Sequence, residues 1–275
     1  MGMKILVIPD AQVRDGVNID HLTAAGNYMV KHRPDTVVVL GDWWDMPSLS
    51  FYTTKMEVEG KRILADLRAG EIALTKFLKP LRALQHKQAQ DKKKVYRPRL
   101  VYTVGNHDPQ VRIPRFLEDN PTMEGMISGD WTTNFLQSNG FEVYQYMEIV
   151  NIEGIRFSHY FINPHSARKN AQAGMIDTAI KNIGFSFVQG HQQGMKLGKH
   201  YLGDGSTRIG VVAGSFYSHD EDYMGIQGNN SHWRGIIQLN EVKNGGADIC
   251  ELSLDYLVRR YYDNNTNDVV DALHS

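Results

Sequence analysis

Five apolar stretches of the chain each end in side chains that could bind a metal ion or transfer a proton. In chain order these side chains are Asp10, Gln12, Asp42, Asp45, Asn106, His107, Asp108, His159, His191 and Gln193. A single aspartate after a strand is usually a turn former or a helix cap. Five such endings in succession favour one composite site instead, built from carboxylate, amide and imidazole groups.

The five stretches are predicted to be β-strands, because each is short and rich in β-branched and aliphatic residues. They cover residues 4–8, 36–40, 100–104, 154–158 and 185–188. In open α/β sheets, ligands bind outside the carboxyl ends of the strands. We therefore expect the five turns to meet in space, although they span most of the chain.

The remaining pattern predicts an α/β protein with two mixed sheets flanked by helices. Helices are expected over residues 19–31, 62–88, 110–119, 123–137 and 171–182, with a kink at Pro80 in the second. Further strands are expected at residues 195–202, 208–213, 233–239 and 248–254. This second group should pair largely antiparallel, because its connections are too short for crossovers.

The balance of charges and the single cysteine limit which partners and which metal sites the chain can have. With 30 basic and 31 acidic residues, no chain-wide basic field indicates a nucleic-acid partner. The only cysteine, Cys250, excludes an intramolecular disulfide and any multi-cysteine metal site, so a metal must use oxygen and imidazole ligands. We expect a cytoplasmic protein without a membrane span. The basic run at residues 92–99 is either a solvated loop or a phosphate contact.

The ordered motifs resemble those of the calcineurin-like metallophosphoesterase family. They are Asp10-Ala11-Gln12, Gly41-Asp42 with Asp45, Gly105-Asn106-His107-Asp108, a lone His159, and Gly190-His191-Gln192-Gln193. The match covers about residues 4–215, and Val212-Ala213-Gly214-Ser215 resembles the strand that follows the last motif in that family. The resemblance implies a four-layer αββα sandwich with a dinuclear metal centre.

Carried over to this sequence, the resemblance gives each motif residue a role. Asp42 would bridge two ions, one completed by Asn106, His159 and His191, and the other by Asp10, Gln12 and Gln193. A metal-bridging hydroxide would attack phosphorus in line, and His107 would protonate the leaving oxygen. Asp45 and Asp108 would orient imidazole and ligands.

The sequence departs from the family at Gln12 and Gln193, where histidine is usual. Glutamine carbonyls are neutral, hard and weak ligands, which favours Mn²⁺, with Mg²⁺ or Fe as alternatives. The second site could therefore be weak, absent, or part of an inactive pocket. Trp43 could wall the cleft and stack on a base, although packing is the competing interpretation, and Arg112 could contact phosphate.

These features predict a phosphoesterase acting on a phosphodiester, in a nucleic acid or a nucleotide. The alternatives are a phosphomonoesterase or nucleotide diphosphatase on the same scaffold, or a binding module that has lost catalysis. Residues 1–262 are expected to form one domain with an inserted helical arm at about 60–99, which could shape the cleft or a homo-oligomer contact. Residues 263–275, rich in Asn and Asp, are expected to be a flexible tail.

Overall fold

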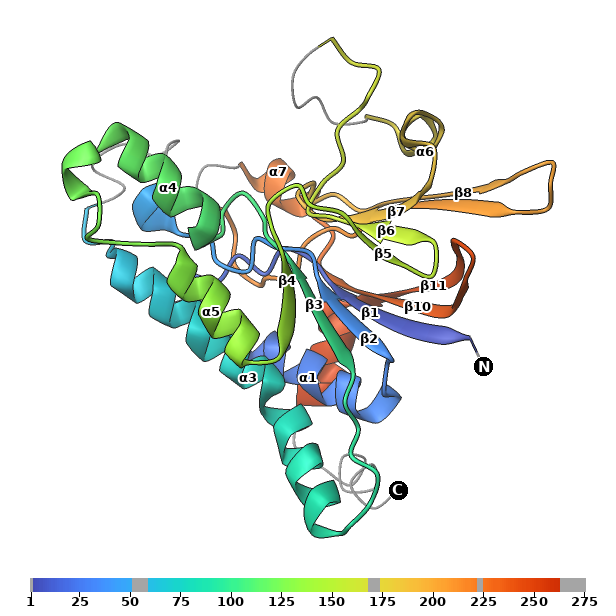
Figure 1. Ribbon diagram of the computed structural model, residues 1–275, viewed down its shortest axis with the longest axis horizontal. Helices are drawn as coiled ribbons and strands as arrows, with labels where there is room; N and C mark the ends of the chain where they lie inside the picture. The colour runs from blue at the N-terminus through green and yellow to red at the C-terminus, as the bar shows by residue number, and fades with distance from the viewer. Residues whose placement is uncertain (1, 51–58, 168–173, 222–224, 263–275) are drawn as a thin grey trace.

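The computed structural model describes residues 2–50, 59–167, 174–221 and 225–262. A six-stranded sheet has the strand order β11-β10-β1-β2-β3-β4 (Figure 1). Its strands are β1 (Met3–Ile8), β2 (Thr36–Val39), β3 (Arg99–Thr103), β4 (Phe141–Tyr144), β10 (Gly235–Lys243) and β11 (Gly246–Ser253). Strands β1 to β4 run parallel, whereas β10 is antiparallel to β1 and to β11.

A second sheet of five strands has the order β5-β6-β7-β9-β8. Its strands are β5 (Val150–Ile152), β6 (Ile155–Phe157), β7 (Ser186–Gln189), β8 (Lys196–Tyr201) and β9 (Thr207–Val212). The central strands β6, β7 and β9 are parallel, and the edge strands β5 and β8 are antiparallel to their neighbours. Both sheets are therefore mixed, as the sequence predicts.

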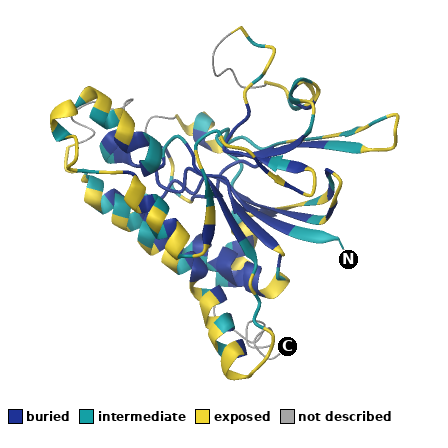
Figure 2. Cartoon of the chain, in the orientation of Figure 1, coloured by how far each residue is buried: buried dark blue, intermediate teal, exposed yellow. Residues whose placement is uncertain are grey.

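The two sheets pack face to face through their aliphatic side chains. On β1, Ile5 and Val7 join the core between the sheets, while Leu6 and Ile8 face the helices on the other side. Figure 2 shows the resulting buried strands at the centre of the molecule. Strands covered on both faces must be apolar throughout, which explains the uninterrupted runs seen in the sequence.

Helices cover the outer faces of both sheets. They are α1 (Asp20–His32), α3 (Ile63–Gln90), α4 (Pro109–Asp119), α5 (Asp130–Ser138), α6 (Ile176–Ile183), α7 (Ile226–Asn230) and α8 (Leu254–Leu257). A 3₁₀ turn covers Pro47–Leu49, another covers Pro121–Met123, and a π-helical turn covers Val258–Tyr262. Figure 1 places α1, α3 and α5 beside the six-stranded sheet and α6 beyond the other sheet. The predicted fold class, two mixed sheets flanked by helices, is confirmed.

Helix α3, which makes up most of the expected inserted arm at about 60–99, packs into the helical layer beside the six-stranded sheet. Its side chains Ala73, Leu74 and Phe77 are fully buried against the sheet and α1. Gly26 of α1 allows close packing, because a Cβ atom there would overlap the carbonyl of Phe77. The helix also continues through Pro80 instead of ending there. Only its last turns extend beyond the sheet (Figure 1).

Other elements differ from the sequence prediction in extent. The sequence pattern does not predict strands β4 and β5, because they are only four and three residues long and Glu142 and Asn151 interrupt their apolar pattern. The helix expected over 123–137 begins only at Asp130, after Gly125 in a left-handed conformation (φ +80°). Residues 171–173 of another predicted helix and the predicted tail at 263–275 lie outside the described residues. Among the described helices, none is long and apolar enough to span a membrane.

Candidate metal centre

The turns that follow β1, β2, β3, β6 and β7 converge between the two sheets. Backbone hydrogen bonds join them directly. Gln12 N donates to Asp42 O at 2.8 Å, and Gly190 N donates to His159 O at 2.9 Å. The segment after β9 joins the same network, where Phe216 N donates to Asp10 O at 2.7 Å. The site is thus built from the carboxyl ends of strands in both sheets.

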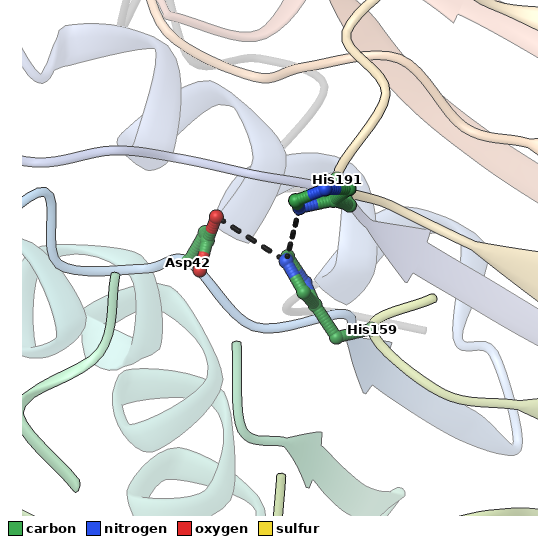
Figure 3. Close-up of side chains that lie close together, drawn as sticks. All are labelled: Asp42, His159 and His191. Atoms are coloured by element: carbon green, nitrogen blue, oxygen red, sulfur yellow. Dashed lines mark hydrogen bonds and ion pairs between the residues drawn. The ribbon is translucent and has the colours of Figure 1, made fainter. Parts of the chain in front are cut away.

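Figure 3 shows the side chains of Asp42, His159 and His191 converging from three of these turns. His159 Nε2 lies 3.2 Å from His191 Nδ1 and 3.3 Å from Asp42 Oδ2. One ligand atom from each residue lies within 4.8 Å of the other two. Metal–ligand distances of about 2.0–2.2 Å place the atoms around one ion roughly 3 Å apart. These three groups can therefore bind the same ion.

Asn106 supplies a fourth ligand atom to this cluster. Its Oδ1 lies 2.9 Å from His159 Nε2. The tautomer of His159 is fixed on the other side of the ring, because Nδ1 donates to the carbonyl of Leu40 at 2.7 Å. A histidine ligand held in this way presents Nε2 to the metal with the ring already oriented. The donor set of two imidazoles, one carboxylate and one amide oxygen suits a divalent ion.

The charges of the cluster are strongly coupled. Burial alone would raise the pKa of Asp42, but the neighbouring His159 and His107 outweigh it and hold that pKa well below its usual range. Burial opposes protonation of His159, yet the Asp42 carboxylate raises the pKa of His159 to about 9. A proton on His159 thus occupies the position where a cation would bind. Burial and the charge of His159 lower the pKa of His191 to about 4, which keeps it neutral.

Asp10 supports the turn that carries His191. It is fully buried, and its two carboxylate oxygens lie 3.0 and 3.1 Å from the backbone N–H of His191, from which they accept a hydrogen bond. Burial raises the pKa of Asp10 to about 7, with the charge of Asp42 acting in the same direction. Asp10 therefore orients one of the ligands of the three-residue cluster.

The backbone is strained at the site. Gln12, Asp42 and His191 all have positive φ, at 39°, 47° and 64°. For residues with a Cβ atom this conformation costs about 1–2 kcal/mol each. Gly105 is required for another reason, because a Cβ atom at this position would overlap the carboxylate of Asp42. Such strain clusters at functional sites, where the surrounding structure enforces it.

His107 is paired with a carboxylate beside the cluster. Its Nδ1 lies 3.1 Å from Asp45 Oδ1, and its backbone N–H donates to Asp42 Oδ1 at 2.7 Å. Burial lowers the pKa of His107, but the charge of Asp42 and the hydrogen bond to Asp45 outweigh it and raise the pKa. Asp45 is itself held by Arg14, whose guanidinium lies 3.5 Å from Oδ2. This arrangement leaves Nε2 of His107 as the atom able to exchange a proton.

Asp108 organises the backbone below the metal ligands. Its buried carboxylate accepts hydrogen bonds at 2.7 to 3.2 Å from the backbone N–H groups of Gly105, Asp42, Trp43 and Trp44. These bonds tie the turn after β2 to the turn after β3. Asp108 therefore holds the backbone of the loop that carries Asp42.

The two glutamines lie together but are bonded to each other. Gln193 Nε2 donates to Gln12 Oε1 at 3.0 Å, and Tyr217 donates to Gln193 Oε1 at 2.5 Å. Both carbonyl oxygens, the only metal-binding atoms of these side chains, thus already accept hydrogen bonds. A second ion at these two glutamines would have to share or displace those hydrogen bonds, whereas Asp42, His159 and His191 of the first site already lie within reach of one ion.

Two residues expected to contact substrate are packed inside the protein. Trp43 is fully buried, and its indole N–H donates to the carbonyl of Gly70 on α3 at 3.1 Å. It cannot stack on a base, so that expectation is wrong and packing is its role. Arg112 is only 5% exposed and donates to the carbonyl of Leu49 at 3.3 Å. It supports the turn after β2 and does not face a substrate.

Several neighbours of the site carry no recognisable motif. Tyr160 stacks on His191 with ring centroids 4.8 Å apart, and Tyr217 also contacts His232 Nδ1 at 2.7 Å. Tyr160 directly follows His159, and Tyr217 follows the Gly-Ser pair after β9. Nearness to these motifs is the one sequence signal that could have drawn attention to the two tyrosines.

Comparison with known proteins adds one relative. The chain matches no known family model. It is 28% identical to the "Gene 54 protein" of Mycobacterium phage L5 over 216 residues, which cover 76% of each chain. That name states no activity.

Proposed function

We propose that this chain is a metal-dependent phosphoesterase. The observation that carries the proposal is the convergence of Asp42, Asn106, His159 and His191 on one point, with the His107–Asp45 pair beside it. The resemblance of the ordered motifs to calcineurin-like phosphoesterases supports the same reaction class. A divalent ion held by these four residues would supply Lewis-acid chemistry to a phosphoryl group, and Mn²⁺, the ion expected from the sequence, is the first to test.

The protein groups have separate tasks in this reaction. The ring of His159 is oriented by the bond from Nδ1 to Leu40, and His191 is held by its backbone bond to Asp10 and by stacking of its ring on Tyr160. Water attacks phosphorus as the P–O bond to the leaving group breaks, and His107, protonated with the help of Asp45, donates its Nε2 proton to the leaving oxygen. Asp45 keeps the ring in the tautomer that this transfer requires.

Charge favours a diester as the substrate. A divalent ion (+2) on the single ligating carboxylate of Asp42 (−1) leaves a formal charge of +1. A phosphodiester carries one negative charge, whereas a phosphomonoester carries nearly two at neutral pH. We therefore place phosphodiesters, in a nucleotide or a nucleic acid, ahead of monoesters as substrates.

The test is hydrolysis of bis-p-nitrophenyl phosphate with added Mn²⁺, with p-nitrophenyl phosphate as the monoester comparison. We expect Mn²⁺-dependent turnover of the diester and a loss of about 100-fold or more in His107→Ala. His200→Ala is the matched control, because this histidine pairs with Asp177 on the far side of the five-stranded sheet. Equal rates for wild type, His107→Ala and Asp42→Ala would refute the proposal.

A further inference from the structure

A directed chain of hydrogen bonds runs through the two glutamines. A carbonyl oxygen can only accept, so the single hydroxyl proton of Tyr217 goes to Gln193 Oε1. The contact from Tyr217 to His232 must then be donated by Nδ1–H of His232. Gln193 Nε2 in turn donates to Gln12 Oε1. Every bond in the series points the same way, from His232 toward Gln12.

The last group in this series is an amide donor. Because Gln12 Oε1 is taken as an acceptor, its Nε2 presents two N–H groups. Among the described residues, none accepts a hydrogen bond from this nitrogen. Although Gln12 as a residue is only 3% exposed, Nε2 is not among the fully buried side-chain atoms that lack a partner, so this nitrogen reaches the surface of the site. There it can donate to water or to an oxygen atom of a bound ligand.

The amide is fixed in place beside the metal ligands. The backbone N–H of Gln12 donates to the carbonyl of Asp42, and the residue is held at φ 39°. Asp10, the other carboxylate at this end of the site, already accepts a hydrogen bond from the backbone of His191. At this end of the site Gln12 therefore contributes N–H donors, because its carbonyl oxygen already accepts from Gln193.

We propose that the Gln12–Gln193 pair replaces a second metal ion, so that the chain binds one divalent ion and Gln12 Nε2 donates to an oxygen of the anionic substrate. A hydrogen-bond donor and a cation can both stabilise negative charge on a nonbridging phosphoryl oxygen, but only the donor matches this network. The nature of the anion rests on the proposed phosphoesterase function. The metal count does not.

The first test is the number of Mn²⁺ ions per chain. Equilibrium dialysis should give one ion, with the electron paramagnetic resonance spectrum of isolated Mn²⁺. The double variant Gln12→His with Gln193→His restores two imidazoles and should bind two spin-coupled ions. Gln192→His is the matched control, because its side chain bonds to Lys196 instead, and it should still bind one. Two coupled ions in the wild type would overturn the proposal.

The second test is the affinity of the Mn²⁺-loaded protein for inorganic phosphate, measured by calorimetry. Loss of one hydrogen bond to a charged group predicts about tenfold weaker binding in Gln12→Ala and no change in Gln192→Ala. Gln12→Met keeps the size of the side chain, adds no charge and removes the donor, so it serves if Gln12→Ala does not fold. Unchanged phosphate affinity in the folded Gln12 variant would overturn the donor role.

These measurements involve no turnover, so they separate this inference from the proposed activity. A protein that binds one Mn²⁺ and binds phosphate through Gln12, yet hydrolyses no ester, would refute the phosphoesterase proposal alone. A protein that hydrolyses the diester with two ions bound would refute the amide replacement alone.

Discussion

Replacing His21 by glutamine should make the protein less sensitive to acid. His21 lies in the first turn of α1 and is 3% exposed. Its Nε2 lies 2.9 Å from the carbonyl of Phe216, to which it donates, and Nδ1 has no hydrogen-bond partner among the described residues. Burial lowers the pKa of His21 from 6.5 to about 4. The native state therefore holds this ring neutral where the unfolded chain would protonate it.

The sign and size of the change in stability with pH follow from the pKa values of His21 in the unfolded and folded states. The unfolded chain takes up a proton near pH 6.5 and the folded protein only near pH 4, so stability is present above 6.5 and is lost as pH falls between them. At pH 5 the loss is about 2 kcal/mol, and it approaches about 3.4 kcal/mol below pH 4. His21→Gln keeps an N–H donor but cannot titrate, so it escapes this loss.

The assay is urea unfolding from pH 8 to pH 5, followed by tryptophan fluorescence with EDTA present throughout. His191 titrates in the same range but does so equally in both proteins, so the comparison isolates His21. The variant is expected to be less stable than the wild type at pH 8. Between pH 8 and pH 5 the free energy of unfolding of the variant should rise by about 2 kcal/mol relative to that of the wild type. If the free energies of unfolding of the two proteins changed in parallel with pH, titration of His21 would not contribute to the loss of stability in acid.

Three further predictions concern the site and its support. Mn²⁺ binding at pH 7 should release about one proton per ion, because His159 is protonated in the metal-free protein. Calorimetry in two buffers of different ionisation enthalpy measures this, and identical heats would contradict it. Gly70→Ala should lower the free energy of unfolding by about 1–3 kcal/mol, since its methyl group would overlap the indole of Trp44. Arg99→Ala should lower the free energy of unfolding by less than about 1 kcal/mol, although Arg99 pairs with Glu142, because that ion pair is exposed. Urea unfolding checks both values.

The strands that carry the site were predictable because they are buried on both faces. Residues 37–40 form an unbroken apolar run, with Val37 and Val39 facing the helices and Val38 and Leu40 facing the second sheet. The turn residues after each run follow from the same logic, since ligand-bearing turns cluster at the carboxyl ends of strands. The short edge strands β4 and β5 have no such run and gave no signal.

The side-chain environment of the site could not be read from the sequence. The role of Trp43 depends on Gly70, which approaches it only because α3 folds back across the sheet. The bond between Gln12 and Gln193 joins residues 181 positions apart, and its direction depends on Tyr217. The sequence marks both glutamines as departures from the family pattern, but only the structure shows that they satisfy each other.

The most direct test of the whole account is a titration of the metal-free protein with Mn²⁺ while diester hydrolysis is followed. We expect the rate to rise in proportion to added metal and to level off at one ion per chain. A rate that stays at background at every Mn²⁺ level would contradict the phosphoesterase proposal, and a rate that levels off only at two ions would contradict the single-ion centre.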